Sequence, residues 1–241
     1  MKTPIVALVS GVFILPFAVH GSVLAEYTFG VPSTASSASS DLDSDSIASV
    51  FTAGAGLDSG SIGFSSTAPS NAGAAAAAPY VRYVRGNTTG NTEADAINGD
   101  DYFSFTITPD ASFEVNLTSL IFDYSANGSG SSGQNTASFF LRSEVDGYAT
   151  NIGITVSATA GVTAADYQRQ TISLTDAAFQ GLSGSTEFRI YLYQTQDSSG
   201  DVARLDNVTL NGSLSAIPEP SSFALLAGIC GLTSVIVRRR R

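Results

Sequence analysis

Apolar and polar residues alternate along much of the chain between residues 101 and 212. In the stretch DYFSFTIT, Phe103, Phe105 and Ile107 fall on one face of an extended chain, and hydroxyl residues fall on the other. A period of two predicts strands that bury one face and expose the other. The same pattern predicts further strands at Ser119–Ala126, Ala137–Ser143, Tyr167–Leu174, Glu187–Gln194 and Val202–Gly212.

Turn-forming residues separate these strands, and signals for helices are few. Gly, Asn, Asp and Ser cluster in NGSGSSG and in QDSSGD, and these residue types favour turns. The helix-like piece is TDAAFQGL, in which Thr175 or Asp176 can cap one short turn. Many short, half-buried strands predict an all-β, antiparallel β-sandwich. The chain length and the long loops favour a jelly roll of roughly eight to ten strands over an immunoglobulin-like sandwich.

Two low-complexity stretches interrupt the first half of the chain. Residues 31–46 read VPSTASSASSDLDSDS, and residues 65–79 read SSTAPSNAGAAAAAP. Stretches rich in Ser, Ala and Gly bury little apolar surface, so both predict long surface loops. The sandwich is therefore expected over residues 26–214, with these two loops inside it.

The first 25 residues have the features of a secretory signal peptide. Lys2 precedes an apolar stretch from Ile5 to Val19, and small residues follow it up to Ala25. Cleavage is predicted after Ala25. Cleavage near Gly21 or Ser22 is the alternative, because VLAEYTF can form a first strand.

The last 25 residues, 217–241, predict a membrane segment. Ser221–Val237 is an uncharged apolar run, and as a helix it would span about 26 Å, enough for a hydrocarbon core. The four arginines that follow, Arg238, Arg239, Arg240 and Arg241, would stay on the cytoplasmic side. The sandwich would then lie outside the membrane.

This tail also resembles a known sorting signal. Pro218, Glu219 and Pro220, a single apolar helix and a terminal arginine cluster occur in this order, as in the PEP-CTERM signal of Gram-negative bacteria. The resemblance implies that a membrane-embedded exosortase processes the chain near Pro-Glu-Pro. The protein would be anchored transiently in the inner membrane and then reach the cell surface or the exopolysaccharide matrix. A permanent single-pass anchor is the alternative.

The interior of the chain is strongly acidic and lacks the usual catalytic bases. Residues 26–216 hold six arginines against twenty acidic residues, a net charge of −14, which would repel nucleic acid phosphates. Lys2, His20 and Cys230 are the sole lysine, histidine and cysteine, and all three lie in the predicted terminal segments. Without a base of near-neutral pKa we expect no enzyme. A glycoside hydrolase that works with two carboxylates is a distant alternative.

Parts of the interior resemble other surface proteins. DYFSFTITPDASFEVNLTSLIFDYSA and RIYLYQTQDSSGDVARLDNVTLNG are similar to paralogous proteins that carry PEP-CTERM tails. More broadly, they are similar to carbohydrate-binding, galactose-binding-like jelly rolls. The second likeness implies a structural Ca²⁺ shared by acids of the first and last strands, for which Glu26 and Asp206 are the nearest matches. No other cofactor is expected.

One predicted strand offers candidate glycan-binding residues. If Phe188 and its alternating neighbours face the core in EFRIYLYQ, then Arg189, Tyr191 and Tyr193 point outward together. Aromatic faces can stack on sugar rings, although such tyrosines can also simply cover the sandwich. The leading hypothesis is an exported, non-enzymatic surface or matrix protein with a structural or adhesive role. The alternative is a carbohydrate-binding module with a specific glycan, and extracellular polysaccharide is the expected partner.

Overall fold

A computed structural model describes residues 22–29, 36–40, 43–57, 81–84, 92–128, 133–162, 165–196 and 201–217; for residues 81–84 it describes the backbone. The predicted signal segment up to Gly21 lies outside this part of the chain. So do residues 65–79, parts of residues 31–46, and the whole tail from Pro218. The predictions for the sorting signal and the membrane segment at 221–237 therefore concern residues outside the described ranges.

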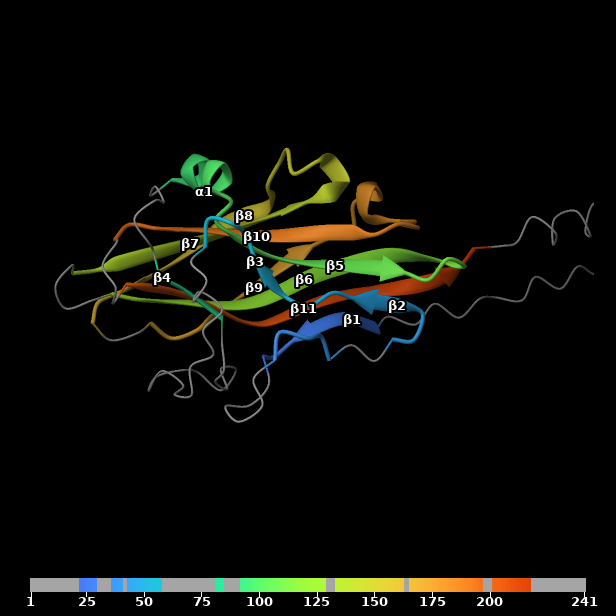
Figure 1. Ribbon diagram of the computed structural model, residues 1–241, viewed down its shortest axis with the longest axis horizontal. Coiled ribbons are helices and arrows are strands. Elements are labelled where there is room, and N and C mark those ends of the chain that lie inside the picture. The colour runs from blue at the N-terminus through green and yellow to red at the C-terminus, as the bar shows by residue number, and fades with distance from the viewer. Residues whose placement is uncertain are drawn as a thin grey trace, which may run out of the picture.

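The described residues form strands almost throughout, with one α-helix and two 3₁₀ turns (Figure 1). The strands are β1 (Ser22–Tyr27), β2 (Ser46–Ala48), β3 (Thr52–Ala53), β4 (Val81–Val84), β5 (Tyr102–Pro109), β6 (Phe113–Asn127), β7 (Asn135–Ser143), β8 (Ile152–Ala160), β9 (Gln168–Ser173), β10 (Thr186–Gln194) and β11 (Val202–Ala216). The helix is α1 (Glu93–Gly99), and the 3₁₀ turns are η1 (Glu144–Asp146) and η2 (Ala177–Phe179).

The strands form two antiparallel sheets that pack face to face. One sheet has the order β1-β11-β6-β9, with β4 also paired to β11. The other has the order β2-β5-β10-β7-β8, with β3 also paired to β5. Along the chain, β5, β6 and β7 alternate between the sheets, β8 stays in the sheet of β7 as its neighbour, and β9, β10 and β11 alternate again. The predicted all-β antiparallel sandwich is confirmed.

The core lies between the two sheets and is built by the alternating residues that the sequence indicated. Phe103 and Phe105 of β5 and Phe188 of β10 are buried there, opposite Leu120 and Phe122 of β6. Phe105 and Phe188 stack with ring centroids 5.7 Å apart, and each buried aromatic ring contributes on the order of 2–3 kcal/mol relative to exposure. Burial of these rings fixes which face of each strand looks outward.

Several described elements, β8 and α1 among them, were not predicted from the sequence. The sequence of β8, IGITVSATA, alternates, but its inward residues are mostly small. The helix α1 begins with a capping box, in which the Thr92 hydroxyl accepts from the Asp95 N–H and the Asp95 carboxylate accepts from the Thr92 N–H. The short helical turn predicted in TDAAFQGL is the 3₁₀ turn η2, but neither Thr175 nor Asp176 caps it through its side chain.

The first strand, β1, bears on the predicted signal cleavage. Leu24 and Ala25 are fully buried in the core, and β1 pairs with β11 from Ser22 to Tyr27. Cleavage after Ala25 would remove most of this strand. The alternative position near Gly21 or Ser22 retains it whole.

Candidate functional site

The outer face of the six-stranded sheet carries an unusual group of large side chains. Arg189, Tyr191 and Tyr193 of β10 point to this face, because Phe188, Ile190 and Leu192 between them belong to the core. We call the group the outer cluster. It consists of Tyr102 of β5, Phe140 of β7, Tyr148 of the loop after η1, and Arg189, Tyr191 and Tyr193 of β10.

Tyr191 lies at the centre of the outer cluster and is 2% exposed. Its ring stacks on Phe140, with centroids 5.1 Å apart and planes 10° from parallel. The Tyr102 ring lies 5.1 Å away on a tilted plane, and Ala96 of α1 packs against the same cluster. Tyr191 therefore presents no free ring face to a ligand, whereas Tyr193 at its edge is half-buried.

Arg189 is held between two tyrosine rings. Its guanidinium carbon lies 4.4 Å from the Tyr102 ring centroid and 3.8 Å from that of Tyr148. Its Nη2 also donates to Glu187 Oε2 at 3.1 Å. Tyr148 has a positive φ of 61°, which is costly for a tyrosine, and its hydroxyl donates to Glu187 Oε2 at 2.5 Å. This backbone strain is offset by the contacts that place Tyr148 over Arg189.

The charges in this group are mutually stabilised. Burial acts to raise the pKa of Glu187, but hydrogen bonds from Arg189, Tyr148 and Ser104 outweigh it and lower the pKa. Burial, followed by the hydrogen bond to Glu187, raises the pKa of Tyr148. Burial acts to lower the pKa of Arg189, but its contacts with Glu187 raise it. At neutral pH the group is an ion pair with a neutral tyrosine, and none of the three is poised to exchange a proton.

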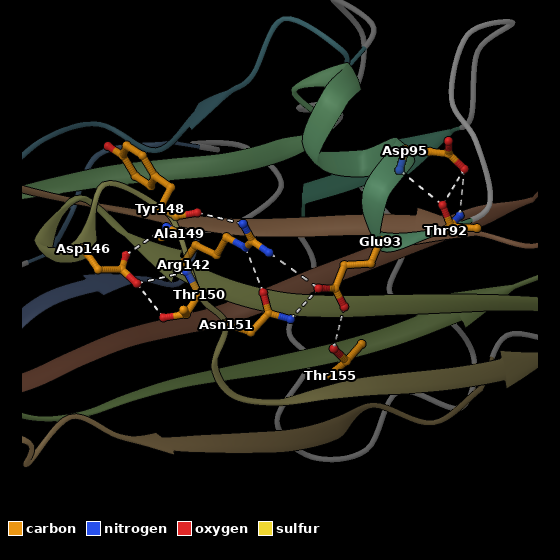
Figure 2. Close-up of polar contacts among 10 residues, drawn as sticks. All are labelled: Thr92, Glu93, Asp95, Arg142, Asp146, Tyr148, Ala149, Thr150, Asn151 and Thr155. Atoms are coloured by element: carbon orange, nitrogen blue, oxygen red, sulfur yellow. Dashed lines mark hydrogen bonds and ion pairs between the residues drawn. The ribbon is translucent and has the colours of Figure 1, made fainter.

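The helix α1 is fixed over the outer cluster by one carboxylate (Figure 2). Glu93, in the first turn of α1, accepts from Asn151 Nδ2 at 2.7 Å and from Thr155 Oγ1 at 3.3 Å. Arg142 of β7 forms an ion pair with it at 3.6 Å. These contacts join α1 to β7 and β8, so the helix covers Tyr191 as part of the folded sandwich.

Arg142 connects this anchor to the loop after η1. Its Nε donates to Asn151 Oδ1 at 2.8 Å, and its Nη1 donates to the Tyr148 carbonyl at 2.7 Å (Figure 2). Its guanidinium also lies 5.7 Å from the Phe140 ring centroid. The backbone of Tyr148 is thus held by the hydrogen bond from Arg142, and the Tyr148 ring covers Arg189.

A row of hydroxyl groups continues the outer face beyond Tyr193. Tyr193 pairs with Ser138 of β7, and Ser138 pairs with Ser157 of β8. The Ser138 and Ser157 hydroxyls are 2.8 Å apart, and those of Thr136 and Thr159 are also 2.8 Å apart. This side of the face offers a half-buried ring beside several hydroxyl groups.

Glu26 and Asp206, the expected calcium ligands, lie in neighbouring strands of the other sheet. Glu26 of β1 pairs with Thr209, and its carboxylate accepts from the Ser40 hydroxyl at 3.0 Å. Asp206 of β11 pairs instead with Asp123 of β6. Among the described residues, no three or more His, Cys, Asp or Glu side chains form a group suited to a metal ion. The calcium site stays a prediction.

Asp123 and Asp206 are neighbouring carboxyl groups, so they can be compared with the two-carboxylate arrangement of a hydrolase. Asp123 accepts from Arg169 at 2.7 and 2.9 Å and from Asn207 Nδ2 at 3.0 Å. Asp206 Oδ1 accepts from the Asn207 N–H at 2.8 Å, while Oδ2 is buried with no hydrogen-bond partner in the described part of the chain. Burial first, and the nearby charge of Asp123 as well, raise the pKa of Asp206 to about 8. Both carboxyls are about 1% exposed and adjacent in one sheet, so they do not face each other across a groove.

No helix among the described residues is long and apolar enough to cross a membrane. The sorting residues Pro218, Glu219, Pro220 and Arg238 to Arg241 lie outside those residues.

The predicted glycan-binding residues were placed on the correct face. Sequence reasoning missed their partners Tyr102, Phe140 and Tyr148, because these lie on other strands and loops, and it also missed Glu187 of β10 itself.

The fold and the outer face together define an all-β antiparallel sandwich with an aromatic–arginine cluster beneath a short helix. No protein-family model matches the chain, and no curated protein matches it either.

Some solved structures are similar to it at low identity. A carbohydrate-binding module described for specific mannan recognition is 12% identical, with 80% of this chain and 98% of that chain covered and a TM-score of 0.37. The K1 cleaved adhesin domain of Lys-gingipain from Porphyromonas gingivalis W83 is 10% identical, with 80% and 98% covered and a TM-score of 0.32. A cyclase from Fischerella sp. TAU is 13% identical, with 64% and 74% covered and a TM-score of 0.31. Likenesses this distant assign no function.

Proposed function

We propose that this protein is an exported, non-enzymatic component of the cell surface or exopolysaccharide matrix of a Gram-negative bacterium, with a structural or adhesive role. An exosortase-type enzyme would process its tail at Pro218, Glu219 and Pro220, while the segment at 221–237 and the four terminal arginines hold it in the inner membrane. The sandwich would then be released outside the cell.

The observation that carries a structural role is the state of the outer cluster. Arg189 lies between two tyrosine rings and is paired with Glu187, and Tyr191 is buried beneath α1. Arg189 and Tyr191 could act as ligand-binding or catalytic side chains if they were exposed, but here they pack against α1 and the loop of Tyr148 and hold both on the sheet. Such packing favours a rigid building unit over a catalytic centre.

Retention of β1 supports signal cleavage near Gly21 or Ser22. Leu24 and Ala25 are fully buried, and the Tyr27 hydroxyl donates to the Ser49 carbonyl at 2.6 Å. A mature protein that begins at Ser22 keeps these contacts. We therefore expect the mature N-terminus at or just before this residue.

Mass spectrometry of the protein from membrane, surface and medium fractions tests export and processing. We expect a surface or medium form trimmed at the N-terminus near Ser22 and at the C-terminus near Pro218. Replacement of Pro218, Glu219 and Pro220 by alanine should leave the C-terminal tail untrimmed and the protein in the membrane. Pro32→Ala should change neither the trimming nor the location. Recovery of the intact translation product from the cytosol would refute the proposal.

Glycan binding is the second candidate, favoured by the row formed by Tyr193, Ser138 and Ser157. A sugar ring can stack on the exposed part of Tyr193, with the hydroxyl groups beside it available for hydrogen bonds. Arg189 and Tyr191 would then act as the support of this site. A pull-down with the host's own exopolysaccharide should retain the wild type and Thr171→Ala, which lies on the other sheet, and should lose Tyr193→Ala. Absence of binding by the wild type would end this candidate.

A further inference from the structure

Among the described residues, the strand β8 forms an open edge of the six-stranded sheet. It pairs with β7 on one side, and the strand order ends with it. An edge strand presents backbone N–H and C=O groups that can pair with another extended chain. Soluble proteins usually protect such edges with charged residues, with proline or by keeping the strand short.

The sequence of β8 has none of these three protections, although the pairing of the strand with β7 is irregular near Gly153. From Ile152 to Ala165 there is no charged residue and no proline, and β8 itself is nine residues long. The other strands at the ends of the two sheets are protected: β1 contains Glu26, β9 contains Arg169, and β2 is three residues long. The open edge at β8 is therefore chemically distinct from the other three.

Two exposed apolar side chains lie along this edge, Ile154 within β8 and Val162 two residues beyond its last residue, Ala160. Ile154 and Val162 are each 70% exposed. Gly153 has a positive φ of 75°, and the pairing of β8 with β7 shifts register between Phe139 and Leu141. This irregularity turns Ile154 out of the core, although Val156 and Ala158 further along the strand are buried.

We propose that β8 pairs antiparallel with β8 of a second copy of this chain, joining two six-stranded sheets into one continuous sheet. A two-fold axis near Ala158 would place Ile154 of each copy opposite Val162 of the other. Both exposed apolar side chains of each copy are then covered in a self-complementary contact, as two-fold symmetry requires. The backbone ladder supplies the affinity, and the two apolar contacts set the register.

Charge favours a second copy at this edge over other places on the surface. The chain carries a net charge of −10, so two copies repel each other wherever their acidic surfaces meet. The uncharged edge allows close approach without that cost. Glu93, the acid that contacts Thr155 of β8, is already paired with Arg142. This dimer does not depend on the route of export or on a glycan ligand.

Photo-crosslinking of the full-length chain tests the pairing directly. A photoreactive phenylalanine analogue at position 154 should yield a covalent dimer, and sequencing of the joined peptides should find β8 of the second copy. The matched control is the same analogue at position 47, because Ile47 lies on the edge strand β2 and is 66% exposed. It should yield no dimer. A crosslink from position 154 to a different protein, or none at all, would overturn the proposal.

A charge on the edge provides a second, independent measurement. Ile154→Lys should weaken self-association of the full-length chain in mild detergent by about tenfold or more, seen by light scattering during size-exclusion chromatography. Ile47→Lys should leave it unchanged. Both isoleucines are exposed, so thermal unfolding should be similar in the two variants. A dimer that survives Ile154→Lys, or a wild type that is monomeric throughout, would show that β8 is not the interface.

Discussion

The buried carboxyl of Asp206 makes the stability of the sandwich depend on pH in a defined direction. Asp206 is 1% exposed, its Oδ2 has no hydrogen-bond partner among the residues that the structure describes, and Asp123 lies opposite it in the β6–β11 ladder. Burial and the charge of Asp123 raise its pKa from 3.8 to about 8. The folded protein therefore keeps a proton that the unfolded chain has already released over this range.

The sign of the effect follows from proton linkage. Between pH about 4 and pH about 8 the folded state binds one proton more than the unfolded state, so stability falls as the pH rises and levels off above pH about 8. Each pH unit in this window removes about 1.4 kcal/mol, and the whole window removes about 6 kcal/mol at most. A loss of that size is a large share of the 5–15 kcal/mol typical of a domain.

Replacement of Asp206 by asparagine keeps the size of the side chain and removes the titration. At pH 8.5 we expect Asp206→Asn to unfold at a higher urea concentration than the wild type, with a free energy of unfolding that is several kcal/mol larger. At pH 4.5 the two proteins should unfold at nearly the same urea concentration. Tyrosine fluorescence can follow unfolding, because the chain contains no tryptophan. Asp176→Asn, which changes an exposed acid beside η2, should keep the pH dependence of the wild type.

Parallel pH profiles of the wild type and Asp206→Asn would refute this reasoning. They would mean that Asp206 is ionised in the folded protein and that its burial is relieved in some other way.

Two further predictions concern local contacts. Glu93→Gln removes the charge that pairs with Arg142, and it should lower the stability of α1 by about 0.5–1 kcal/mol, since Glu93 is partly exposed. Amide hydrogen exchange should become faster in α1 and stay the same in β11. Unchanged exchange in α1 would contradict this prediction. Gly153→Ala should destabilise the protein by about 1–2 kcal/mol, because φ is 75° and the new Cβ would lie 3.3 Å from Ile172 Cγ2. The control is Gly184→Ala, because its new Cβ would meet nothing within 4 Å. Its free energy of unfolding in urea should stay within about 0.5 kcal/mol of the wild type. Equal losses of stability in the two variants would rule out backbone strain at Gly153 as the cause.

Local patterns were sufficient to predict most of the strands and their buried faces. In β5 and β10 the alternation is carried by large residues such as Phe105, Phe188 and Ile190, all of which are buried as predicted. The same pattern in β8 is weaker because Ala158 and Ala160 stand at its inward positions. For α1, the Thr92–Asp95 capping box is the local signal that indicates the start of a helix.

The environment of the candidate glycan-binding residues could not be predicted in this way. The sequence placed Arg189 and Tyr191 on the outer face, but α1, about a hundred residues earlier in the chain, covers Tyr191. Tyr148 reaches Arg189 from a loop whose backbone has a positive φ, and no pattern within β10 indicates that contact.

The sequence by itself determined the two-residue period of the strands, the all-β sandwich, and the acidic interior without a lysine or histidine. The tertiary structure alone decided that Asp206 lies against Asp123, that Arg189 lies between two tyrosine rings, and that β8 ends a sheet. The physical reason is that alternation depends on neighbours two residues apart, whereas these contacts depend on the register between strands far apart in the chain. Register is set by the burial of the whole core at once, and no single segment contains that information.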